Sequence, residues 1–227
     1  MTQKIIFTLL VCFYFQAAIA QHQATFDKFR QETGDYAALF QGKIERGYSS
    51  SEYANHPYWL DKSFHSGTVS YKGLLYSELS LRYDTYLHQL IVNTPVKKTN
   101  ISIDMTAVDY FIINQIKFVR QERKFVALHY ESSRMRLIQT FQCGFGTPIT
   151  KNQISYKNFK QSSQYYLQQG EQSYEVKSLA SVQKLFPQHK KQLKQFAKEK
   201  QLNFKEKRTA ALTALIRYAD QISMQEP

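Results

Sequence analysis

The chain of 227 residues has only two cysteines, one tryptophan and no apolar run long enough to span a membrane. After residue 20 no stretch approaches the roughly 18 apolar residues of a membrane-spanning helix, so we expect no transmembrane segment in the mature chain. Cys12 lies in the N-terminal segment that we expect to be removed on export. The mature chain then keeps only Cys143, which excludes an intramolecular disulfide. Stability must then come from buried side chains, which a hydrophobic content of 43% can supply.

Acidic residues are also scarce: 18 Asp and Glu stand against 30 Lys and Arg, which gives a net charge of +12. Such a surplus favours anionic partners, for example lipid head groups, acidic glycans, acidic proteins or nucleic acid. If the chain is exported, as the first 20 residues predict below, nucleic acid is the least accessible of these partners, so we expect no nucleic-acid partner. A merely solubilising surface is the alternative interpretation.

The motifs of several enzyme classes are missing, namely the nucleophile elbow, the P-loop, the dinucleotide fingerprint and the zincin motif. The six histidines never occur as H-x-H or H-x-x-x-H, so no metal-ligand spacing is present. Ser181 and Lys184 have the S-x-x-K spacing of penicillin-binding enzymes, but without the companion motifs we interpret them as helix surface. We therefore expect a non-catalytic protein with no cofactor and no metal.

The first 20 residues have the layout of a secretory signal peptide. Lys4 provides a positive start, an apolar run covers residues 5–15, and small residues precede the expected cleavage between Ala20 and Gln21. This predicts export to the periplasm or the cell exterior. A short N-terminal anchor that is never cleaved is the alternative.

A β-rich domain is expected over residues 21–177, because apolar and polar residues alternate in many short runs separated by turn residues. The expected strands cover residues 68–71, 74–83, 86–92, 101–103, 108–113, 116–119, 125–130, 135–141, 164–167 and 174–176. The intervals are too short for parallel crossovers. The pattern predicts an antiparallel meander or a partly closed barrel.

The spacing of apolar residues changes at Ser178, and residues 178–227 are expected to form a C-terminal helical subdomain. Ser178 is a suitable N-cap for a first helix that ends at Pro187. Further helices are predicted over residues 188–200 and about 206–222, each with one apolar stripe. The fold class is thus α+β, with a sheet followed by helices packed on it.

Two groups of residues are candidate binding sites. The first is a basic patch on one face of the predicted second helix, formed by Lys190, Lys191, Lys194 and Lys198. Such a patch suits an anionic surface, although it also resembles the solvated face of any amphipathic helix. The second is a cluster at a strand end, formed by Arg82, Tyr83, Asp84 and Tyr86. Arg82 and Asp84 share a face, so they could pair with each other or bind a ligand.

Three segments together resemble a group of uncharacterised exported proteins of Gram-negative bacteria. These segments cover residues 68–86, 165–177 and 185–205. The resemblance implies a strand-rich body with a lysine-rich helical end and a periplasmic or envelope setting. It implies no activity and assigns no functional residue.

From these observations we expect a non-catalytic envelope protein that binds another envelope protein or an anionic surface. The alternative is a carrier that holds a hydrophobic, lipid-like ligand within a curved sheet, since Tyr, Phe and Leu are abundant on the predicted strands.

Overall fold

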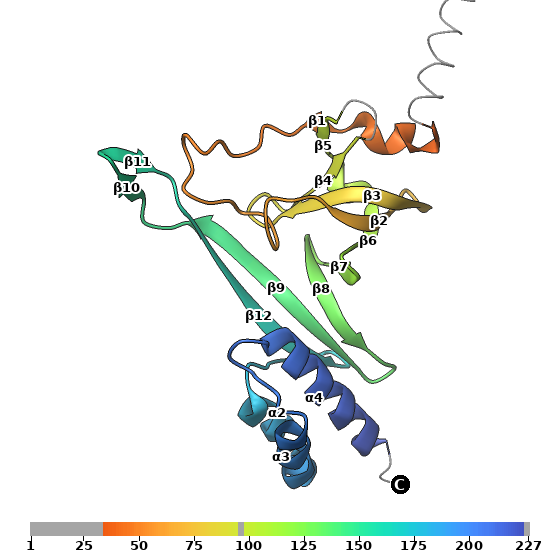
Figure 1. Cartoon of the computed structure of the whole chain (residues 1–227). Coiled ribbons are helices and arrows are strands. Elements are labelled where there is room, and N and C mark those ends of the chain that lie inside the picture. The colour runs from red at the N-terminus through yellow and green to blue at the C-terminus, as the bar shows by residue number, and fades with distance from the viewer. Residues whose placement is uncertain (1–33, 95–97, 225–227) are drawn as a thin grey trace, which may run out of the picture.

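The computed structural model describes residues 34–94 and 98–224 (Figure 1). The predicted signal peptide lies outside these residues. A long antiparallel sheet runs through the molecule. One half of the sheet curls over itself, and long strands of the other half lead to three helices at the far end (Figure 1).

The sheet has eleven strands in the order β1-β5-β4-β3-β2-β6-β7-β8-β9-β12-β13, and every neighbouring pair is antiparallel. The strands are β1 (Lys43–Ile44), β2 (His65–Tyr71), β3 (Leu74–Asp84), β4 (Gln89–Asn93), β5 (Asn100–Ser102), β6 (Val108–Ile113), β7 (Ile116–Gln121), β8 (Lys124–Glu131), β9 (Met135–Phe145), β12 (Phe159–Gln169) and β13 (Gln172–Glu175). The predicted antiparallel pairing and the α+β class are confirmed. The strand order is not a simple meander, because β6 pairs with β2 rather than with β5, the strand before it in the chain. The sheet does not close into a barrel, because β1 and β13 remain its two edges.

A register shift between β2 and β3 changes which side chains face inward. The pairing slips between Gly67 and Val69, and opposite this point Glu78 has a positive φ of 54°. The extra residue lets Tyr76 and Leu79, three positions apart, both point into the core. Leu74, which simple alternation places on the buried face, is instead 61% exposed.

The first core fills the concave side of the curled half. Tyr83, Phe111 and Phe118 are fully buried there, and the rings of Phe111 and Phe118 are stacked with centroids 4.6 Å apart. Leu39, in the short 3-10 helix Gly34–Gln41, and Trp59 add to this core. Aromatic rings packed in this way contribute much of the apolar area that the curled half buries.

The second core lies on the same face of the sheet, where Leu137 of β9 and Leu167 of β12 meet the helices. The helices are α2 (Leu179–Leu185), α3 (Lys190–Glu199) and α4 (Arg208–Ser223). Ser178 caps α2 as predicted, in a capping box with Ser181. Pro187 opens a 3-10 turn, Pro187–His189, so α3 begins at Lys190 rather than at residue 188.

The region between residues 141 and 164 differs from the prediction. Strand β9 continues through Cys143 and Gly144 to Phe145, and β12 already begins at Phe159. Between them β10 (Ile149–Lys151) and β11 (Ile154–Tyr156) form a separate hairpin. Alternation could not reveal these strands, because both faces of the hairpin and the first part of β12 are largely exposed. Residues 86–88, predicted as strand, form the turn before β4.

Candidate binding surface and the residues that position it

Arg82 lies between two aromatic rings. Its guanidinium carbon is 3.9 Å from the ring centroid of Tyr58 and 4.3 Å from that of Phe64. It forms an ion pair with Glu45 at 2.8 Å, and about a tenth of each side chain is exposed. The hydroxyl of Tyr58 donates to the second carboxylate oxygen of Glu45 at 2.7 Å. Arg82 therefore fastens the segment of residues 45–64 across the outer face of β3.

Asp84 is buried and has its own set of partners. Its carboxylate accepts a hydrogen bond from the Tyr48 hydroxyl at 2.6 Å and from the backbone N–H groups of Tyr86 and Leu87 at 2.8 Å each. Burial raises the pKa of Asp84, although these hydrogen bonds act in the opposite direction. The suggested Arg82–Asp84 pair is thus replaced by Arg82–Glu45 and Tyr48–Asp84. Tyr83 points to the opposite face, into the first core.

The fourth member of the predicted cluster, Tyr86, belongs to a group of rings that we call the root cluster. The root cluster consists of Tyr53, Tyr86, Phe145 and Phe159. Phe159 is buried at its centre, 5.5 Å from the Tyr53 ring, 5.3 Å from the Tyr86 ring and 4.9 Å from the Phe145 ring. The Asn55 side-chain amide donates a hydrogen bond to the Phe159 carbonyl oxygen and accepts one from the Phe159 backbone N–H, both at 2.7 Å.

The root cluster lies where the hairpin β10–β11 leaves the sheet. We call residues 147–157 the arm, and Figure 1 shows it projecting from the body of the molecule. Its turn, Asn152–Gln153, has positive φ at both positions, as a tight two-residue hairpin turn requires. Backbone bonds between Lys157 and residues 52 and 54 tie the arm to the segment that Arg82 fastens. The predicted strand-end cluster therefore helps to position the arm.

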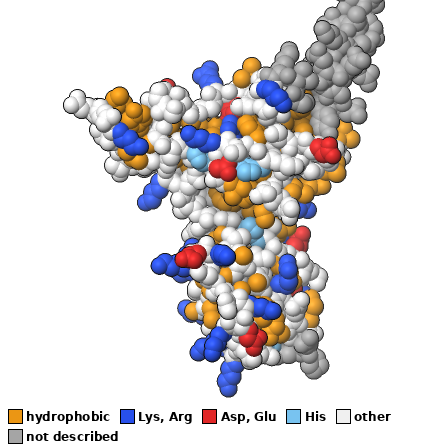
Figure 2. Space-filling view, viewed as in Figure 1, with side chains coloured by type: hydrophobic (Ala, Val, Ile, Leu, Met, Phe, Trp, Pro, Cys, Tyr) orange, Lys and Arg blue, Asp and Glu red, His pale blue; other side chains and the backbone are white. Residues whose placement is uncertain are grey.

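One face of the arm is largely apolar and exposed to solvent. Ile149 lies opposite Tyr156 and Lys151 lies opposite Ile154, which places these four side chains on the same face. Ile154 is 54% exposed and Ile149 38% exposed, and Phe145 at the root is 53% exposed. Figure 2 shows hydrophobic side chains gathered on the arm beside a basic one. Thr150 and Ser155 occupy the other, polar face.

The arm belongs to a stretch of the chain without acidic residues. Between Glu131 and Glu171 there is no Asp or Glu, whereas Lys151, Lys157 and Lys160 lie on the arm or at its root. Lys157 also stands 5.2 Å from the Tyr53 ring. Sequence reasoning missed the arm as a candidate surface. The acid-free stretch is the signal that could have revealed it.

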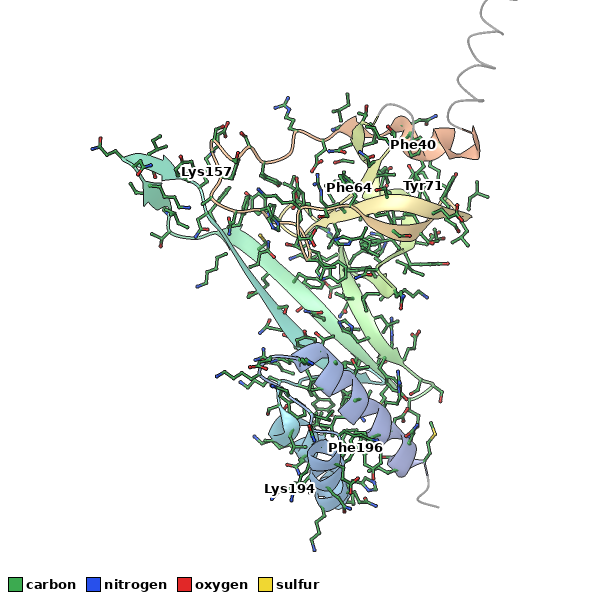
Figure 3. The ribbon with its side chains drawn as sticks, viewed as in Figure 1. Phe40, Phe64, Tyr71, Lys157, Lys194 and Phe196 are labelled. Atoms are coloured by element: carbon green, nitrogen blue, oxygen red, sulfur yellow. The ribbon has the colours of Figure 1, made fainter. Side chains whose placement is uncertain are left out.

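The predicted basic patch is present on α3 but lies at the other end of the molecule. Its four lysines are exposed, and Figure 3 shows Lys194 far from Lys157. The apolar side of α3 faces inward, where Leu193 is buried and the Phe196 ring stacks on Tyr218 with centroids 4.1 Å apart. The lysine face of α3 thus offers charge alone, while the arm offers charge together with apolar side chains.

Ser181 and Cys143 are two further residues with chemically reactive side chains. The Ser181 hydroxyl donates to the Ser178 carbonyl oxygen at 2.7 Å, so it serves the helix cap rather than a reaction with Lys184. Cys143 is a half-buried free thiol, and burial raises its pKa. Within residues 34–94 and 98–224, no group of three His, Cys, Asp or Glu side chains could hold a metal ion.

An open groove of about 590 Å³ lies on the face of β8, β9 and β12 that is turned away from the helices. Val126, Ile138 and Tyr166 belong to its lining, together with polar and charged side chains such as Lys124 and Gln142. The groove is open and mixed in character. The arm is the better-defined candidate surface.

Together these features describe the architecture: an open antiparallel sheet with two cores, a helical end and a projecting hairpin. No protein-family model, curated protein or solved structure matches the chain. Among the helices of the described ranges, none combines the length and the apolar character needed to cross a membrane.

Proposed function

We propose that this protein is an exported, non-catalytic binding module of the cell envelope and that the arm is its principal contact element. The observation that carries the proposal is the exposed apolar face of a projecting hairpin whose root is held by stacked rings. Contiguous exposed apolar patches on soluble proteins often mark interaction sites. The N-terminal signal pattern and the resemblance to exported proteins support the envelope setting.

The proposed carrier function for a lipid-like ligand has less support. Tyr83, Phe111 and Phe118 fill the concave side of the curled half among the described residues, which leaves a ligand little room there. The outer groove lined by Val126 and Ile138 is a more accessible place for an acyl chain. Native mass spectrometry of the freshly purified protein would reveal a carrier through lipid adducts.

Photo-crosslinking in the native host tests the proposed function. A photoreactive phenylalanine analogue at Ile154 on the arm should capture an envelope component, because this side chain points outward. The same analogue at Glu171, in the exposed turn between β12 and β13, serves as the control and should capture little. N-terminal sequencing of the purified product should begin at Gln21. A product that starts at Met1 in the cytosol, or equal capture from both positions, would contradict the proposal.

A further inference from the structure

The apolar face of the arm is narrow and flat. It consists of Ile149, Ile154 and Tyr156, with Lys151 on the same face close to the turn. Stable protein–protein interfaces bury about 800 Å² on each partner and usually offer a shaped core of anchoring side chains. Two strands of three residues each provide far less than this. The arm is better suited to a partner that needs no matching shape.

The charges near this face are mostly positive. Lys151 lies on the face, and Lys157 and Lys160 lie at the root, within the stretch that lacks Asp and Glu. Glu52, in the segment next to Lys157, is the acidic residue at the base of the arm. Lysine carries a compact charge on a flexible stem, which contacts phosphate head groups without demanding a fixed geometry. An apolar face edged by lysines is the arrangement by which amphipathic elements lie in the interfacial plane of anionic membranes.

We propose that the arm lies with its apolar face in the interfacial region of an anionic lipid surface, while its lysines contact the head groups. This inference rests on the proposed function and names the partner class of the same element. Two structural features fit the arrangement. The polar face with Thr150 and Ser155 would remain in water, and the root cluster fixes the arm in advance, so little order has to be gained on binding.

The test is co-sedimentation of the mature chain with vesicles of phosphatidylcholine that contain phosphatidylglycerol, compared with vesicles of phosphatidylcholine alone. We expect binding to the anionic vesicles only. Each lysine near such a surface contributes about a fivefold gain in affinity. The double reversal K151E/K160E should therefore weaken binding by roughly 25-fold or more. The double substitution I149S/I154S should abolish sedimentation at low protein concentration.

The matched control is K191E/K194E on α3, which changes the net charge by the same amount at the far end of the molecule. It should weaken binding by less than about threefold if the arm is the contact, because charges beyond a Debye length of about 8 Å act weakly. All the substituted side chains are exposed, so thermal melting followed by circular dichroism should agree with the wild type. Equal losses from both reversals would overturn the proposal, as would full binding by I149S/I154S.

Tryptophan placement gives a second readout. Brominated anionic lipids should quench the fluorescence of I154W much more than that of T150W, because only residue 154 lies on the apolar face. Trp59 contributes the same background to both variants. Equal quenching would contradict the proposed orientation. Failure to bind vesicles, together with crosslinking of a protein from Ile154 in cells, would refute the lipid partner and leave the proposed function standing.

Discussion

The Arg82–Glu45 pair permits a sharp test of how the outer segment is held on β3. Both side chains are about 90% buried, and the two carboxylate oxygens of Glu45 are used by Arg82 and Tyr58. Replacing Arg82 with Met removes one charge and leaves the carboxylate of Glu45 in the same environment. Breaking a buried ion pair from one side typically costs about 3–5 kcal/mol, and we expect Arg82→Met to fall in this range.

Glu45→Gln should cost less, about 1.5–3 kcal/mol, because Arg82 keeps both aromatic rings and the carbonyl oxygen of Lys62. In the double variant neither buried charge remains. Its loss in unfolding free energy should therefore be smaller than the sum of the two single losses by about 1.5–3 kcal/mol.

Urea unfolding of the mature chain at neutral pH, followed by circular dichroism, measures all three losses. Arg123→Met is the control, since Arg123 is exposed in the turn between β7 and β8 and its replacement should change stability by less than about 0.5 kcal/mol. Hydrogen exchange should also accelerate across residues 45–64 in Arg82→Met. Additive losses in the double variant, or a loss below about 1 kcal/mol for Arg82→Met, would refute this reasoning.

Three further predictions concern single side chains. Burial raises the pKa of Asp84 above its ordinary value of 3.8. The wild type should therefore lose stability as the pH rises from 3.8 through the raised pKa, because the carboxyl group then ionises in a buried place. Urea titrations should show Asp84→Asn gaining stability relative to the wild type over the same rise. Burial alone would raise the pKa of Asp220, but hydrogen bonds from Ser132, Tyr130 and Arg134 lower it, so its contribution is present above pH 3.8 and is lost as pH falls through the lowered pKa. Asp220→Asn should cost about 1–2 kcal/mol at neutral pH, since Arg134 is partly solvated, and should approach the wild type in acid; a constant difference would contradict the ion pair. Ser178→Ala should cost about 1 kcal/mol in thermal or urea unfolding through loss of the α2 cap, and an unchanged stability would contradict the capping box.

The sequence predicted those parts of the fold in which one face is buried and the other is wet. Residues 108–113 were predicted as a strand with the bounds that β6 has, because Val108, Phe111 and Ile113 are buried among more exposed neighbours. Ser178 likewise marked the start of α2. The alternation of apolar and polar residues failed to predict strands where no face of the strand is buried. The arm buries neither face, residues 160–162 of β12 are all exposed, and the shift at Glu78 breaks the period of two that alternation assumes.

The candidate site was predicted in part and for a different role. Arg82, Asp84 and Tyr86 were selected because charged and aromatic side chains gather at a strand end, and the structure does place them in one continuous network. Their partners Glu45, Tyr48 and Phe159 lie 36 or more residues away in sequence, so no local pattern could supply them. Only the topology, which brings the ends of β3, β9 and β12 beside residues 45–64, makes this network visible.

This network explains why a hairpin with little burial of its own keeps a defined direction. A two-stranded hairpin is marginally stable in water, and the arm has only three residue pairs. Its two connections to the sheet leave from Phe145 and Phe159, whose rings stack on each other and on Tyr53. Tyr53 belongs to the segment that Arg82 and Glu45 hold on β3. Loosening the ion pair should therefore weaken whatever the arm binds without altering a residue of the arm, which links the stability of the outer segment to the proposed function.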